Sequence, residues 1–117
     1  MNVNDFDRLY RRTKTGIGVT GETVRLRLNP IKARKFRVLT HVTVENLTSA
    51  YTKCRLGLSH SETDLYLDEL TTIAANELAV SRSDILLGEG DYFFAELTGT
   101  TTGDNLVMVC VGWELDL

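Results

Sequence analysis

Through most of this chain, apolar side chains recur at every second position, in runs separated by short polar turns. The longest run spans residues 36–47, where Phe36, Val38, Val42 and Val44 share one face and mainly polar residues share the other. Successive strand side chains point to opposite faces, so a period of two is typical of a half-buried β-strand. Several short runs of this kind, in a chain with one proline, predict an all-β fold with antiparallel sheets.

The same pattern defines the remaining strands. The run over residues 106–115 is apolar on both faces, which is typical of a central strand. The region after residue 70 is less regular: we favour a strand, a bend and a second strand with Leu78 and Val80 inside, and a short helix over 73–78 is the alternative. The other predicted strands are residues 24–28, 53–58, 64–73 and 92–97.

The first 21 residues differ from the rest and predict an N-terminal arm. Phe6, Leu9 and Tyr10 have the spacing of one helical face, but so short a helix is marginal in water, and three glycines follow it. The arm is therefore expected to be extended or briefly helical and to become ordered on another surface. The predicted organisation is an arm over 1–21 and one antiparallel β-sandwich over 22–117, either jelly-roll-like or immunoglobulin-like.

The charges are distributed unevenly along the chain. The formal net charge is -3, yet residues 1–53 hold 11 basic and 4 acidic side chains, net +7, and residues 54–117 hold 2 and 12, net -10. Such a difference between halves points to contacts with oppositely charged partners, including other copies of the chain. We therefore expect a homo-oligomer.

The basic cluster is the strongest candidate site. A solvated edge, docking onto an acidic protein surface and contact with nucleic-acid phosphates all fit it. Nucleic acid is the less favoured partner, because few aromatic side chains that could stack on bases lie nearby and the whole chain is acidic. The residues predicted to contact a partner are Arg8, Leu9, Tyr10, Arg11, Arg12, Lys14, Arg25, Arg27, Lys32, Arg34 and Lys35.

No motif predicts catalysis, a cofactor or a metal. Ser59 and His60 are adjacent on an extended segment and point to opposite faces, which separates them. The paired-glycine segments lack the full phosphate-binding signatures, and the histidines and cysteines lack metal-ligand spacing. Cys54 and Cys110 lie in apolar runs and are expected to be buried free thiols. The chain is thus expected not to be an enzyme. It has no apolar run close to the roughly 20 residues that a membrane-spanning helix needs. Its first residues carry charges where a signal peptide would have its apolar stretch, so a cleaved signal is not expected.

Aromatic side chains in the C-terminal half of the chain allow one further alternative, a carbohydrate-binding face. Alternating aromatics on covered strands are usually core residues, as expected for Phe93 and Phe94. A carbohydrate-binding sandwich stays open if Tyr66, Tyr92 and Trp113 expose one face together.

The order of strands and turns from Phe36 to Leu115 resembles that of small β-sandwich virion proteins of tailed bacteriophages. The resemblance implies a structural role in the virion: a capsid decoration (cement) protein, or alternatively a neck or tail-completion protein. It implies major capsid or neck proteins as partners and assembly into the virion after synthesis in the host cytoplasm. It does not cover residues 1–35. The segments that carry it are Glu45-Asn-Leu-Thr48, Ile73-Ala-Ala-Asn-Glu-Leu78, Ile85-Leu-Leu-Gly-Glu-Gly-Asp91 and Gly112-Trp-Glu-Leu115.

Overall fold

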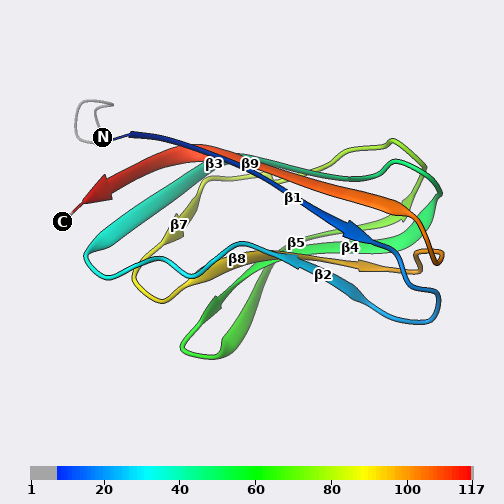
Figure 1. Ribbon diagram of the computed structural model, residues 1–117, viewed down its shortest axis with the longest axis horizontal. Coiled ribbons are helices and arrows are strands. Elements are labelled where there is room, and N and C mark those ends of the chain that lie inside the picture. Colours follow the sequence, from blue (N-terminus) through cyan, green and yellow to red (C-terminus); the bar gives the residue numbers. More distant parts are fainter. Residues whose placement is uncertain (1–7, 117) are drawn as a thin grey trace.

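Two antiparallel β-sheets face each other in the computed structural model, which describes residues 8–116 (Figure 1). The predicted all-β sandwich is confirmed, and no helix that could cross a membrane occurs in this part of the chain. The first sheet has the order β1 (Arg8–Ile17), β9 (Asn105–Asp116), β3 (Lys35–Asn46) and β6 (Ala79–Val80), with β7 (Ile85–Leu87) also paired to β3. The second sheet has the order β2 (Val24–Arg27), β8 (Tyr92–Thr98), β4 (Tyr51–His60) and β5 (Thr63–Ile73).

The core lies between the sheets and follows the alternation of the sequence. On the central strand β9, Leu106, Met108 and Cys110 are buried, and Phe93 and Ala95 of β8 belong to the same core. Both central strands are apolar on the face that meets the opposite sheet, which is why they can be covered. Burial of these side chains supplies the main favourable free energy of folding.

The prediction that Phe36, Val38, Val42 and Val44 share one face is wrong. The pairing of β3 with β9 shifts by one residue between Leu39 and His41, a β-bulge that changes which alternate residues point inward. Leu39 therefore joins Val42 and Val44 in the core, all three being fully buried. The sequence hides this shift, because consecutive apolar residues precede it.

The segment between β5 and β7 also differs from the prediction. Ala79 is the buried residue of β6, and Leu78 and Val80 are 49% and 41% exposed, so the expectation that these two point inward is wrong. Ala79 pairs with Val44, which turns its neighbours away from the core. The alternative of a helix over 73–78 is also wrong, because this stretch forms the end of β5 and a turn.

Residues 8–17, which were assigned to the arm, form β1 along the edge of the first sheet. All ten residues pair with β9, and Tyr10 is buried. Of the two alternatives for the arm, the extended one describes these residues, and the helical one is wrong for residues 8–12. Residues 1–7, including Phe6, lie outside the described residues. The boundary at residue 21 stays a prediction.

A buried polar network fixes the loops at one end of the sandwich. The Asp104 carboxylate accepts hydrogen bonds from Asn46 Nδ2, Ser49 Oγ and the Thr101 amide, each at 2.8 Å. The Asn46 side chain and the Thr101 amide, assisted by Ser49, lower the pKa of Asp104 because they stabilise its charged form. The network thus holds the turns before β4 and β9 together as long as Asp104 is ionised.

This network predicts a pH-dependent stability. The pKa of Asp104 is lower in the folded chain than the usual 3.8, which applies to the unfolded chain. The stability that ionised Asp104 contributes is therefore complete well above pH 3.8 and is lost as the pH falls toward the folded-state pKa. Urea unfolding of Asp104→Asn should therefore show a deficit relative to wild type at pH 7 that narrows by pH 3. Asp84→Asn, at an exposed loop position, is the matched control and should follow the wild type. A deficit that stays constant over this range would contradict the assignment.

Candidate functional site

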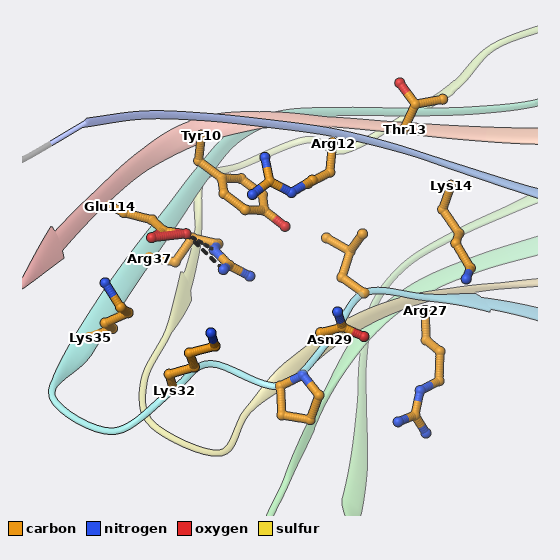
Figure 2. Close-up of a pocket in the computed structure, with 12 residues that line it drawn as sticks. Tyr10, Arg12, Thr13, Lys14, Arg27, Asn29, Lys32, Lys35, Arg37 and Glu114 are labelled. Carbon is orange, nitrogen blue, oxygen red and sulfur yellow. Dashed lines mark hydrogen bonds and ion pairs between the residues drawn. The ribbon is translucent and has the colours of Figure 1, made fainter.

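A groove of about 360 Å³ opens between the edges of the two sheets, where β1 and the end of β2 face each other (Figure 2). We call it the basic groove. Its lining carries six basic side chains and one carboxylate. The lining residues are Tyr10, Arg12, Thr13, Lys14, Arg27, Leu28, Asn29, Pro30, Lys32, Lys35, Arg37 and Glu114.

The position of β1 at the sheet edge explains why cations line a cleft between two apolar sheets. Arg12 and Lys14 pair with Cys110 and Met108 of β9, whose side chains point into the core. Side chains that are opposite each other across a pair of strands lie on the same face, so Arg12 and Lys14 also point inward. Within the described part of the chain, β1 is the edge strand on this side, and both residues are exposed at the mouth of the sandwich.

The opposite wall comes from the segment that joins β2 to β3. The amide of Leu28 donates to the Phe93 carbonyl at 3.0 Å, and the amide of Ile31 donates to the Asp91 carbonyl at 2.9 Å. These bonds hold the segment against the second sheet. Lys32 is thereby placed across the groove from β1 (Figure 2).

The inner end of the groove is a packed arrangement of aromatic and charged groups. Two guanidinium groups lie over the Tyr10 ring, with Arg37 at 3.8 Å and Arg12 at 4.8 Å from its centroid. Arg37 donates to Glu114 at 2.8 Å, and both side chains are almost fully buried. Burial raises the pKa of the Tyr10 hydroxyl, which stays protonated at neutral pH. The charge of Arg37 at this end of the groove is therefore neutralised by Glu114.

The outer part of the groove is not neutralised in the same way. Lys35 forms an ion pair with Asp116 at 2.6 Å. Among residues 8–116, no ion pair within 4 Å joins a carboxylate to any of the other four cations; Arg27 instead lies over the Tyr92 ring at 4.5 Å. These four, Arg12, Lys14, Arg27 and Lys32, give the groove a positive field that favours an anionic partner.

The structure brings only part of the predicted contact set together. Leu9, Arg11 and Arg34 are exposed outside the groove, and Arg8 begins β1, with its side chain outside the described part. Tyr10, although in the groove, is buried beneath the guanidinium groups. The members that line the groove are Tyr10, Arg12, Lys14, Arg27, Lys32 and Lys35.

Arg25 has a different role from the one expected. It lies on the outer face of the second sheet, where it forms ion pairs with Asp64 and Glu96, both at 2.7 Å. Its guanidinium also lies 4.0 Å from the Phe94 ring centroid. These hydrogen-bonded carboxylates raise the pKa of Arg25 further above its ordinary value, so it stays charged. The residue therefore holds β2, β5 and β8 together, and its contact role stays a prediction.

Sequence reasoning left two charged groove residues, Arg37 and Glu114, out of the contact set. Arg37 was visible as a basic residue, but its partner Glu114 lies 77 positions away. The two are opposite each other in the pairing of β3 with β9. Only the strand register could have linked them.

The aromatic residues do not form one platform. Tyr66 and Tyr92 lie on the second sheet, where Arg55 covers Tyr66 at 3.5 Å and Arg27 covers Tyr92. Trp113 belongs to β9 in the first sheet. The condition set for a carbohydrate-binding face, joint exposure of the three rings, is therefore not met.

The cysteines are as predicted. Cys54 and Cys110 are both free and buried. Burial raises the pKa of Cys54 to about 11 and that of Cys110 to about 12, so both are protonated thiols at neutral pH. Among the described residues, no group of three or more His, Cys, Asp and Glu side chains is arranged to hold a metal ion.

Comparison with known proteins gives a fold but no sequence family: no family model and no curated protein matches this chain. A chain of the turret of an archaeal virus, described as a triple jelly roll, is similar with a TM-score of 0.68 and 16% identity. That match covers 95% of this chain and 30% of the archaeal virus chain, so this chain spans less than a third of that protein.

Two further solved structures match over most of both chains. A chain from the acid-stable capsid of Helicobacter pylori bacteriophage KHP30 is similar with a TM-score of 0.63 and 13% identity, covering 96% of each chain. A chain of the disulfide-linked pili of Bacillus endospore appendages follows, with a TM-score of 0.55, 7% identity and coverage of 94% and 88%. At these identities the matches establish architecture. The chain has a jelly-roll sandwich of the kind that occurs in viral capsids.

Proposed function

We propose that this chain is a non-enzymatic structural protein of a virus particle, and that it decorates the capsid. The observation that carries the proposal is the likeness to the phage KHP30 capsid chain, which extends over 96% of both chains. A match over nearly the whole of both chains supports a comparable unit more strongly than a match to one domain of a large protein. Fold likeness alone does not fix function, so the surface must fit the role as well.

The surface supports a role in contacts with other proteins. The basic groove has four cations without a carboxylate partner among residues 8–116, and its inner end is packed around the buried Arg37–Glu114 ion pair. A preorganised charged groove favours a specific orientation of a partner and faster encounter with it. Acidic surfaces of the major capsid protein or of neighbouring decoration subunits are the partners that this groove suits.

Decoration and a neck or tail-completion role predict different positions on the virion. Purified particles of the virus that encodes the chain can be labelled with a gold-conjugated antibody raised against it and imaged by electron microscopy. Decoration predicts label over the whole head. Label at a single vertex would overturn decoration in favour of the neck role, and absence of the chain from particles by mass spectrometry would overturn a structural role.

A further inference from the structure

The side of the sandwich away from the basic groove ends in a long edge strand, β5. β5 is 11 residues long, and among residues 8–116 it pairs only with β4, so no described strand pairs with the backbone groups along its outer edge. Leu65 and Leu67 are each 46% exposed on it, and Leu70 is 38% exposed. Natural edge strands are usually short or carry charges, proline or bulges; β5 is long and has no lysine or proline, and its protection is limited to three carboxylates and a bulge at Leu67.

The neighbouring edge of the first sheet extends this apolar surface. Leu78 and Val80 are exposed beside β6, and a groove of about 450 Å³ separates them from β5. Three carboxylates and one arginine line this groove. We call this surface the acidic edge, defined by Leu67, Asp68, Glu69, Leu70, Glu77, Leu78, Val80 and Arg82.

The acidic edge and the basic groove lie on opposite sides of the molecule. In each sheet the strand order runs from one side to the other: β1 and β2 border the basic groove, and β6 and β5 border the acidic edge. The groove lining carries six cations against one carboxylate, and the acidic edge carries three carboxylates against one cation. Asp68 is paired with Arg82 at 3.0 Å, and Glu69 is paired with Arg55 at 3.2 Å, but the Glu69 side chain stays 51% exposed and Glu77 adds a further negative charge.

From this arrangement we propose that the chain assembles head to tail with itself, the acidic edge of one copy docking against the basic groove of the next. The inference rests on the proposed structural role, for which it names the contact. Apolar side chains such as Leu67 and Leu78 leave water in this contact, and the opposite charges set its orientation. Two different surfaces meet, so the contact is heterologous and closes into a ring when the rotation between copies allows.

A second copy fits the observations better than nucleic acid does. Phosphates would use the cations of the groove but would leave the exposed leucines of the acidic edge without a role. Tyr10, the aromatic residue among the described residues that line the groove, offers no free face to bases because it is buried beneath two guanidinium groups. The groove's neighbour Tyr92 is covered by Arg27.

Charge reversal tests the contact in solution. Lys14→Glu alters the groove and Glu69→Lys alters the acidic edge, and each should raise the dissociation constant for self-association by about tenfold or more. Mixing the two variants should restore assembly to near the wild-type level, because an altered groove then meets an altered edge and a native groove meets a native edge. Sedimentation velocity at low salt measures the three samples. Assembly of the wild type should weaken as salt is raised.

Matched controls lie on the outer faces of the sheets. Lys53→Glu on β4 and Glu45→Lys on β3 make the same charge changes away from both surfaces and should associate like the wild type. Leu67→Lys should also weaken assembly, whereas Leu47→Lys, at a similarly exposed turn position, should not. Thermal melting of every variant confirms that it is folded.

Three results would overturn the contact: a wild type that stays monomeric at millimolar concentration, a mixture no better than its two components, or controls as damaging as the test variants. Tight binding of a DNA duplex that Lys14→Glu abolishes, with self-association unchanged by it, would assign the groove to nucleic acid instead. A chain present in virions yet monomeric in solution would reject this contact and keep the proposed function. A chain that self-associates but is absent from virions would keep this contact and reject the proposed function.

Discussion

Replacing Gly112 with alanine is expected to destabilise the sandwich more than any exposed substitution in the chain. Gly112 lies in the middle of β9 and pairs with Tyr10 of β1 on one side and Leu39 of β3 on the other. A Cβ at this position would collide with the carbonyl oxygen of Val38, and would lie 2.9 Å from the Leu39 Cα. These are backbone atoms of β3, beside its bulge, so no rotamer change can make room.

The two central strands of the first sheet would have to separate in Gly112→Ala. Overpacking of a well-packed interior costs about 1–3 kcal/mol when side chains can adjust, and we expect a cost at or above the upper end here. A loss of this size is a large fraction of the roughly 5–15 kcal/mol that keeps a domain folded. Urea unfolding should show a lower midpoint, with about 3 kcal/mol or more lost in the free energy of unfolding.

Gly88→Ala is the matched control for this substitution. Among the described residues, and apart from the two chain neighbours, a Cβ at Gly88 would meet just the Asp91 Oδ2, at an ordinary contact distance of 3.8 Å. Alanine there should change the free energy of unfolding by less than about 1 kcal/mol in either direction. Equal midpoints for Gly112→Ala and the wild type would show that β3 and β9 are not as close as the structure places them.

The alternation of apolar and polar residues predicted part of the fold. It predicted the sandwich and the central position of the last strand, because the pattern within each run shows which of its faces is buried. The bulge after Leu39 and the single buried residue Ala79 depend on how β3 pairs with strands distant in sequence. Where apolar residues are consecutive, as at Val38 and Leu39, alternation alone cannot assign the inward one.

The candidate site was predictable to the same extent. The basic cluster was visible in the charge distribution, and most of its members line one groove. Which cations are neutralised was not visible, because Arg25 and its partners Asp64 and Glu96 come from three strands. Pairing of this kind follows from the tertiary arrangement and separates the cations that hold the sheets together from those that can bind a partner.

The Arg37–Glu114 pair is the clearest case of a neutralised charge, and removing one partner should be costly. In Glu114→Ala, the guanidinium of Arg37, 11% exposed, would remain beneath the groove without this carboxylate. Breaking a buried ion pair in this way typically costs about 3–5 kcal/mol, because a desolvated charge is left uncompensated. The free energy of unfolding from urea titration at pH 7 should fall by about this amount.

The neighbouring pair on the same two strands provides the comparison. Lys35 and Asp116 occupy the next register position that faces the same way, but their side chains are 23% and 53% exposed. Asp116→Ala should therefore cost only about 0–1 kcal/mol, since exposed ion pairs contribute little. The double variant Arg37→Met with Glu114→Leu removes both charges and should recover most of the stability that Glu114→Ala loses. If Glu114→Ala and Asp116→Ala proved equally mild, the inner end of the groove would be hydrated, and its rigidity could not orient a partner.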